Sequence, residues 1–130
     1  MHQFATARTS MVDSQIHTMG VVSEPVLNAF RTVQREKFVP EDKRAFAYND
    51  EDLPIGNGRY LMEPVTHARM MQAALPTPKD VVLDVACGTG YSSAIFAKLV
   101  SHVVASDPDA KLLAHAEKQW AESKLGNVVP

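Results

Sequence analysis

The hydrophobic pattern of the chain is most distinctive between residues 81 and 100. Val81–Val85 is apolar except for Asp84, which predicts a short strand buried on both faces, as in a parallel sheet. Small residues follow at alternate positions, and an apolar-periodic segment then covers residues 94–100. The small residues are Ala86, Gly88 and Gly90. Strand, small-residue loop and helix in this order predict the first half of a nucleotide-binding crossover unit.

A second strand, a helix and the start of a third strand follow along the chain. His102–Ser106 predicts the strand, and Asp107 comes directly after it. An acidic residue there can accept hydrogen bonds from both hydroxyls of a ribose. Asp109 is better placed than Asp107 to cap the next helix, whose apolar positions are Leu112, Leu113, Ala116 and Trp120. Val128–Val129 predicts the start of a third strand.

The N-terminal part predicts helices. Met11, Ile16 and Met19 indicate a helix that ends near Gly20. A second helix is capped by Ser23, has Pro25 in its first turn, and shares one apolar face among Val26, Leu27, Phe30 and Val33. Residues 41–48 predict one more short helix, with Phe46 and Tyr48 pointing inward.

Residues 56–64 predict a tight turn followed by an extended segment. Gly56–Asn57–Gly58 forms the turn, and Tyr60, Leu61 and Met62 run extended before Pro64 begins a helix. The apolar positions of this helix are Val65, Ala68, Met70, Met71 and Leu75. The segment is either an ordinary loop and core helix or a stretch that reaches over a ligand. His67 either faces that ligand or has a surface or packing role.

Composition narrows the class of protein. The 130 residues are 45% hydrophobic and 22% charged with a formal net charge of −2, which gives no indication of nucleic-acid or membrane binding. The single cysteine, Cys87, excludes an intrachain disulfide and predicts a reducing compartment, here the cytoplasm. The five histidines are scattered without metal-ligand spacing, so no metal is expected.

The spacing of the central loop separates two classes of cofactor. Loop N–H groups and the positive end of a helix favour a carboxylate or a phosphate. A dinucleotide fingerprint requires Gly-x-Gly-x-x-Gly, but Ser93 stands at its third glycine, so a nicotinamide-dependent dehydrogenase is a distant alternative. Asp84-x-Ala86-x-Gly88-x-Gly90 is closer to the acidic-x-Gly-x-Gly-x-Gly loop of S-adenosylmethionine-dependent methyltransferases. Ala86 in place of glycine predicts a less demanding first turn with negative φ.

Several segments, which together cover nearly the whole chain, match the pattern of one family. The glycine loop alone is typical of a wide class, whereas Leu53–Pro54–Ile55–Gly56–Asn57–Gly58 at its distance before the loop singles out this family. Other matching stretches are Met11–Ile16, Arg35–Pro40, Ala47–Tyr48, Glu63–Pro64 with Ala68–Met70, and Val82–Gly90. On these residues the chain resembles the protein-L-isoaspartate O-methyltransferase family.

The resemblance implies an α/β fold: the N-terminal half of a Rossmann-like, three-layer αβα methyltransferase with a helical N-terminal extension. Residues 1–58 would form the extension and loop, and residues 59–130 a partial methyltransferase domain. It also implies S-adenosylmethionine as methyl donor, with S-adenosylhomocysteine as product. The expected cofactor-binding residues are Tyr60, Leu61, Met62, His67, Asp84, Ala86, Gly88, Gly90 and Asp107.

The implied reaction is methyl transfer to the carboxylate of an isoaspartyl residue in a damaged protein, which is protein repair. A carboxylate is ionised at pH 7 and needs no strong general base, so catalysis would come from alignment of nucleophile, methyl and sulfur. The resemblance implies a protein or peptide substrate, with no nucleic-acid or membrane partner, and a monomer when full length.

Two departures from the family pattern stand out. Family members carry Thr-Ile-Ser-x-Pro where this chain has Tyr60–Leu61–Met62–Glu63–Pro64, so Met62 occupies the position of the substrate-associated serine and no catalytic residue is assigned. The family also continues beyond a third strand, which predicts that this chain is a C-terminally truncated fragment with its first sheet strand at an exposed edge. A methyltransferase with another substrate and an inactive cofactor-binding fragment are the alternatives.

Overall fold

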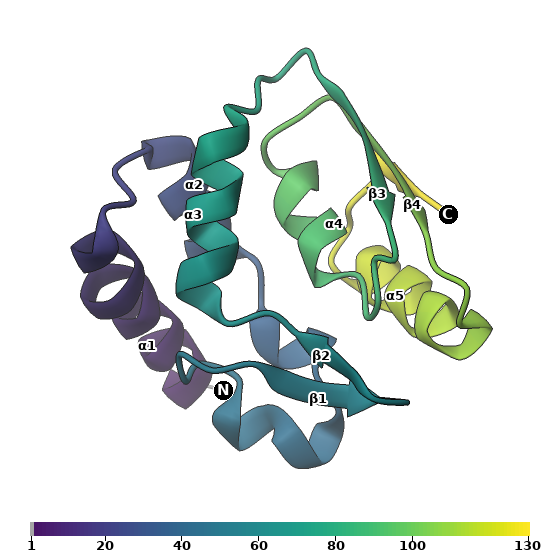
Figure 1. The fold of residues 1–130 in the computed structure, drawn as a ribbon, viewed down its shortest axis with the longest axis horizontal. Coiled ribbons are helices and arrows are strands. Elements are labelled where there is room, and N and C mark those ends of the chain that lie inside the picture. The colour runs from purple at the N-terminus through teal and green to yellow at the C-terminus, as the bar shows by residue number, and fades with distance from the viewer. Residues whose placement is uncertain (1) are drawn as a thin grey trace. The chain divides into compact units, whose positions relative to one another are not determined.

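The computed structural model describes residues 2–130, in which the chain divides into two compact units, Met1–Leu75 and Pro76–Pro130 (Figure 1). The boundary expected between residues 58 and 59 falls inside a hairpin of the first unit. The glycine loop therefore belongs to the second unit, and the Tyr60–Met62 segment belongs to the first.

Helices form most of the first unit. Helix α1 (His2–Ser10) continues into the π-helix η1 (Met11–Ile16) and the 3₁₀-helix η2 (His17–Met19). These end at Gly20, whose φ of 95° is the left-handed conformation that stops a helix, as predicted. Helix α2 (Glu24–Thr32) begins at Ser23, whose Oγ accepts a hydrogen bond from the Val26 N–H at 3.4 Å, which confirms the predicted cap.

Two short 3₁₀-helices follow, η3 (Arg35–Phe38) and η4 (Glu41–Phe46). Tyr48 is buried as predicted, but Phe46 is 47% exposed and the prediction that it points inward is wrong. Side chains two positions apart in a helical turn point to opposite sides, so only one of this pair can face the interior.

A hairpin and a helix complete the first unit. Strand β1 (Leu53–Gly56) pairs antiparallel with β2 (Arg59–Leu61), and helix α3 (Pro64–Ala74) begins at Pro64 as predicted. Val65, Ala68 and Met71 are buried along one stripe of α3. Met70 and Leu75 are exposed, contrary to expectation, because Met70 lies off that stripe and Leu75 ends the helix with a left-handed φ of 51°.

The second unit alternates strands and helices, as the sequence predicts. The order is β3 (Val81–Val85), α4 (Tyr91–Ala97), β4 (His102–Ser106), α5 (Ala110–Glu122) and β5 (Val128–Val129). The three strands form a parallel sheet in the order β3-β4-β5. Strand β3 is thus an edge strand of this sheet, as expected from the resemblance.

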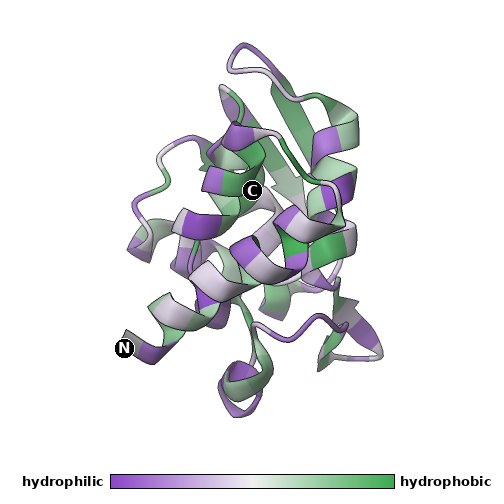
Figure 2. Cartoon of the chain, turned by 90° about the vertical axis from the view of Figure 1, so that its left-hand side faces the viewer, coloured by the Kyte–Doolittle hydropathy of each residue, from purple (hydrophilic) through white to green (hydrophobic). Residues whose placement is uncertain are grey.

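One face of this sheet is exposed. Val81, Leu83 and Val85 are each about two-thirds exposed, at 66–68%, so the prediction that β3 is buried on both faces is wrong. Leu83 is in register with Val104, which is also exposed, whereas Val103 and Ala105 on the other side are buried. Helix α4 contacts all three strands. The strands are largely coloured as hydrophobic in Figure 2, so the exposed face is apolar.

Candidate functional site

The loop after β3 has a positive φ at each of its small residues. The φ angles are 61° at Ala86, 59° at Gly88 and 92° at Gly90. The prediction of a negative φ at Ala86 is wrong: the turn out of β3 requires the left-handed conformation at this position too. Alanine pays roughly 1–2 kcal/mol for it, which glycine would not. The small residues at every second position of the loop therefore mark the positions where the backbone is left-handed.

Strand β4 holds this loop from the neighbouring position in the sheet. The Cys87 N–H donates to the Ser106 carbonyl at 2.9 Å, and the Gly88 N–H donates to Asp107 Oδ2 at 2.8 Å. The other Asp107 oxygen, Oδ1, accepts the Asp109 N–H at 2.8 Å. Asp107 therefore lies beside the glycine loop, at the carboxyl ends of two adjacent parallel strands, where α/β sheets bind ligands.

Asp109 rather than Asp107 caps the helix that follows, as the sequence predicts. Asp109 caps α5 by accepting the N–H groups of Lys111 and Leu112 at 3.0 and 3.3 Å. Asp107 does not cap the helix, and its partly exposed carboxylate faces the loop. Each carboxylate oxygen has two lone pairs, so accepting one backbone N–H does not exclude a ligand hydroxyl at the same oxygen.

Asp84 and Ser93 form a link that sequence reasoning missed. Asp84 Oδ2 accepts hydrogen bonds from the Ser92 hydroxyl at 2.6 Å and from the Ser93 hydroxyl at 2.7 Å. The carboxylate thus ties β3 to the first turn of α4 across the loop. Ser93 stands where a dinucleotide fingerprint has glycine, and in this structure its hydroxyl has the specific partner Asp84.

Thr89 is a buried polar residue of the loop. Its side chain lies between Gly88 and Gly90 and is buried. Within residues 2–130, no hydrogen-bond partner reaches its Oγ1. A buried hydroxyl without a partner is costly, and a polar ligand against the loop would relieve that cost. The partly exposed Asp107 carboxylate beside this loop can accept hydrogen bonds from a ligand that carries hydroxyls, such as a nucleoside.

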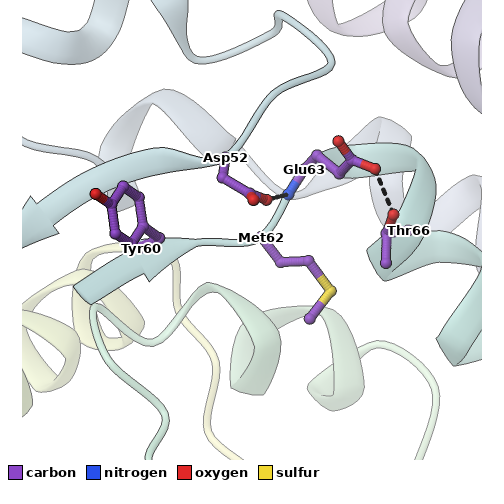
Figure 3. A pocket seen from close by; sticks show the side chains of 5 residues that line it. All are labelled: Asp52, Tyr60, Met62, Glu63 and Thr66. Atoms are coloured by element: carbon purple, nitrogen blue, oxygen red, sulfur yellow. Dashed lines mark hydrogen bonds between the residues drawn. The ribbon is translucent and has the colours of Figure 1, made fainter. Parts of the chain in front are cut away.

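The first unit contributes a separate candidate pocket, of about 400 Å³, beside the N-terminus of α3 (Figure 3). It is lined by Asp52, Tyr60, Met62, Glu63 and Thr66. Asp52 Oδ1 accepts the Glu63 N–H at 2.8 Å, and Glu63 Oε1 accepts the Thr66 hydroxyl at 2.5 Å. Tyr60 and Met62 are exposed at this pocket, whereas Leu61 between them is buried and does not line it.

A buried arginine fixes the backbone at Met62. The Arg35 guanidinium donates from Nη2 to the Met62 carbonyl at 3.0 Å and from Nε to the Ala47 carbonyl at 2.6 Å. Arg35 is fully buried, and nothing in its hydrophilic character predicted this from the sequence. Arg35 does lie in Arg35–Pro40, one of the stretches that carry the family resemblance. That resemblance was the signal in the sequence that this residue is important.

His67 packs inside the first unit. Its ring meets Phe30 edge-to-face, with centroids 5.2 Å apart and an interplanar angle of 83°. Burial, with a smaller contribution from the positive charge of Arg35, lowers the pKa of His67 to about 3. The imidazole is therefore neutral at pH 7. Of the two roles considered for this residue, packing is the one its contacts describe.

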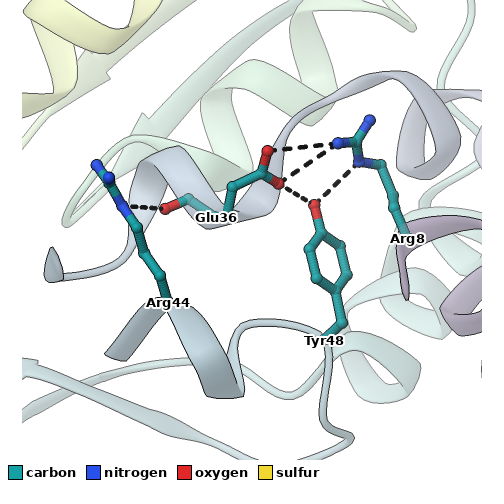
Figure 4. Close-up of polar contacts among 4 residues, drawn as sticks. All are labelled: Arg8, Glu36, Arg44 and Tyr48. Atoms are coloured by element: carbon teal, nitrogen blue, oxygen red, sulfur yellow. Dashed lines mark hydrogen bonds and ion pairs between the residues drawn. The ribbon is translucent and has the colours of Figure 1, made fainter. Parts of the chain in front are cut away.

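A polar cluster of Arg8, Glu36 and Tyr48 joins α1, η3 and the turn that follows η4 (Figure 4). Arg8 donates from Nε to the Tyr48 hydroxyl at 2.9 Å and pairs with Glu36 at 3.4 Å, and the Tyr48 hydroxyl donates to Glu36. Burial and the hydrogen bond to Glu36 raise the pKa of Tyr48 well above its usual value. Because the members satisfy one another, we regard the cluster as structural.

Residues 2–130 offer neither a metal site nor a membrane-spanning helix. They contain no group of three His, Cys, Asp or Glu side chains placed to hold a metal ion, and Cys87 is buried. Within the same range, every helix is too short or too polar to cross a bilayer.

The family model and the curated relatives that match this chain point to the same family. Residues 6–129 match the family described as protein-L-isoaspartate(D-aspartate) O-methyltransferase. A protein-L-isoaspartate O-methyltransferase 2 of Anaeromyxobacter sp. is 39% identical over 123 residues, which are 95% of this chain and 51% of that protein. A protein-L-isoaspartate O-methyltransferase of Koribacter versatilis is 41% identical over 113 residues, 87% of this chain and 51% of that protein.

Solved structures agree on the fold. A protein-L-isoaspartate O-methyltransferase structure superposes with a TM-score of 0.79 at 24% identity, over 94% of this chain and 40% of that one. A Plasmodium falciparum structure, described as this type of methyltransferase in complex with S-adenosyl-L-homocysteine, gives 0.77 at 20% identity, over 93% of this chain and 60% of that one. The chain spans about half the length of the curated relatives it matches. It belongs to the protein-L-isoaspartate O-methyltransferase family.

Proposed function

We propose that the second unit binds S-adenosylmethionine at the loop between Ala86 and Gly90. The observation that carries this is the loop itself, with positive φ at every second residue and its Gly88 N–H bonded to the Asp107 carboxylate. Family membership supports the same ligand class, and so does the fold shared with a structure described as a complex with S-adenosyl-L-homocysteine.

In this proposal, different residues in and beside the loop contact different parts of the ligand. Asp107 accepts hydrogen bonds from the ribose hydroxyls, because its carboxylate lies at the end of the strand next to the loop. Ala86 and Gly88 bring the main chain close to the ligand, and Thr89 offers a buried hydroxyl. Asp84 supports these contacts indirectly by bracing α4 through Ser92 and Ser93.

The reaction we infer for the whole protein is methylation of an isoaspartyl carboxylate in damaged proteins. The cofactor supplies a methyl group on a sulfonium, which is activated without help from the protein. The acceptor carboxylate is ionised at neutral pH, so this chain's residues have to bind and orient it and exclude water. A Ser-His-Asp or metal constellation is not required for such chemistry.

Met62 favours a second candidate, a related methyltransferase with a different substrate. A thioether cannot donate a hydrogen bond to a substrate carboxylate, and the family serine at this position could. Asp52 and Glu63 line the same pocket and would repel an anionic substrate. We also propose the cytoplasm as the place of action, where a lone thiol such as Cys87 stays reduced.

Calorimetric titration with S-adenosylhomocysteine tests the cofactor. We expect saturable binding, with no binding of NAD under the same conditions. Asp107→Ala should weaken the affinity by roughly 10-fold to 100-fold, since it removes hydrogen bonds to a charged acceptor. Asp80→Ala is the matched control, because it removes an exposed carboxylate just before β3, at the opposite end of that strand from the loop, and should leave the affinity within about twofold. Binding of NAD in place of S-adenosylhomocysteine would overturn the proposal.

Met62→Ser tests the acceptor. In the full-length protein we expect this change to raise turnover on an isoaspartyl peptide by about 10-fold, because a hydroxyl donor is restored in the pocket. Met70→Ser, on an exposed part of α3, is the control and should leave turnover unchanged. Equal turnover of Met62→Ser and the parent would show that this position does not select the substrate.

A further inference from the structure

Trp120 is hydrogen-bonded to the proposed cofactor loop. It is the one tryptophan of the chain, lies on α5, and is 3% exposed. Its indole N–H donates to the Gly90 carbonyl at 2.9 Å, across 30 positions of sequence. The same carbonyl accepts the Ala94 N–H at 3.0 Å, the first hydrogen bond of α4. One carbonyl therefore joins the loop, α4 and α5.

Gly90 is seated directly on α5. A Cβ built at Gly90 would lie 2.6 Å from Ala116 Cβ and 2.7 Å from Trp120 Nε1, closer than real side-chain carbons approach such atoms. Its φ of 92° is unfavourable for any side chain as well. The last glycine of the loop is thus required twice, once by its conformation and once by the contact with α5.

Helix α5 also reaches the loop through its start. Asp109 caps α5, its N–H donates to Asp107, and Asp107 accepts the Gly88 N–H. Trp120, eleven residues after Asp109, reaches Gly90 from the same helix. The loop is therefore fixed to one rigid helix at both Gly88 and Gly90, so a change in the loop must be transmitted to Trp120.

We propose that Trp120 is a positioning residue for cofactor binding: its indole N–H sets the orientation of the Gly90 peptide and hence of the loop that contacts the ligand. The proposal rests on the proposed function of the loop. The competing view is that Trp120 only fills space, with its N–H bonded because buried indoles need an acceptor. The two views differ in what removal of the N–H alone does to the ligand.

The first measurement uses the lone indole as a probe. In the 130-residue chain labelled with ¹⁵N-tryptophan, the single indole N–H resonance is followed during titration with S-adenosylhomocysteine. We expect it to shift saturably, with the dissociation constant found by calorimetry. A resonance that stays fixed while calorimetry shows saturable binding would contradict the coupling.

The second measurement removes the donor and keeps the shape. Trp120 is replaced by benzothienylalanine, in which sulfur takes the place of the indole N–H, and in parallel by phenylalanine. We expect S-adenosylhomocysteine to bind about fivefold to tenfold more weakly to both variants, the effect of one buried hydrogen bond. Val128→Ala, at the opposite end of the sheet from the loop, is a control for general loss of packing and should leave the affinity unchanged.

The third measurement needs no ligand. Hydrogen exchange of the amides between Gly88 and Ser92 should become at least about fivefold faster in the benzothienylalanine protein, while those of Val103 and Ala105 stay unchanged. Unaltered loop exchange, or an isosteric variant that binds with the parent affinity, would overturn the role of Trp120. If the parent chain binds no S-adenosylhomocysteine, the proposed function fails, and the exchange data alone decide whether Trp120 orders the loop.

Discussion

The two units of the chain stabilise their backbones in different ways. The first unit has buried charged side chains, Arg35 and Glu36, and short irregular helices. The second unit has regular parallel strands that satisfy one another, and it leaves one apolar sheet face exposed. Irregular segments leave carbonyl groups without ladder partners, so side chains must supply the hydrogen bonds there. Regular pairing removes that need but does not cover the face of a sheet.

The largest expected effect comes from removing the buried Arg35 side chain of the first unit. Arg35→Ala removes two donors from the Ala47 and Met62 carbonyls and leaves a cavity, so we expect a loss of about 3–5 kcal/mol in the free energy of unfolding. Urea unfolding followed by circular dichroism measures it. Arg31→Ala is the control, since the Arg31 side chain is partly exposed and pairs at the surface with Asp13 and Glu24. It should cost less than about 1 kcal/mol. Equal losses would show that Arg35 is not a structural anchor.

The next effect is a pH dependence that the first unit should show. The folded His67 has a pKa of about 3, and the unfolded imidazole has its ordinary value of 6.5. Below pH 6.5 only the unfolded state takes up this proton, so stability present above pH 6.5 is lost as the pH falls. The slope is at most about 1.4 kcal/mol per pH unit, roughly 2 kcal/mol between pH 7 and 5.

His67→Leu should remove that part of the slope. Unfolding free energies of the parent and the variant, measured at several pH values, give the difference directly. A parent and variant with parallel pH profiles between 7 and 5 would mean that the folded imidazole does take up the proton.

A smaller effect concerns the loop of the second unit. Ala86→Gly should raise the free energy of unfolding by about 1 kcal/mol, because glycine adopts a φ of 61° without the strain that alanine has. Ala114→Gly is the matched control: Ala114 is also exposed but lies in the middle of α5, where glycine should cost about 0.5–1 kcal/mol. Destabilisation by both changes would contradict a left-handed Ala86.

The smallest effect concerns the exposed face of the sheet. Leu83→Thr should change the free energy of unfolding by less than about 0.5 kcal/mol and should reduce binding of a hydrophobic dye, because Leu83 is mostly exposed. Val103→Thr, on the covered side of the neighbouring strand, should cost about 1–3 kcal/mol. A large loss from Leu83→Thr would show that this face is covered in solution.

Sequence reasoning was most reliable where local chemistry determines the backbone. The cap at Ser23, the stop at Gly20 and the helix start at Pro64 depend on a few neighbouring residues, and all three were predicted. The crossover order of the second unit followed from hydrophobic periodicity alone. The position of Asp107 beside the loop followed from its place at the end of a strand.

It failed where the outcome depends on distant parts of the chain. The apolar run Val81–Val85 predicts burial on both faces, but burial is a property of what covers a strand, which its own residues do not encode. Burial of Arg35 and the contact between Trp120 and Gly90 depend on partners up to 30 residues away. Ala86 shows a third kind of error, because tertiary constraints can hold a residue in a conformation that its own preference opposes.

The Arg35 guanidinium also has a consequence for how the chain can vary. By joining the Ala47 and Met62 carbonyls, it closes the base of the segment that contains the β1–β2 hairpin. The tip at Gly56 and Gly58 has open space around both positions. Length changes at this tip are therefore separated from the Met62 carbonyl by a fixed base, so an insertion there should alter the Tyr60 side of the pocket and leave the backbone at Met62 in place.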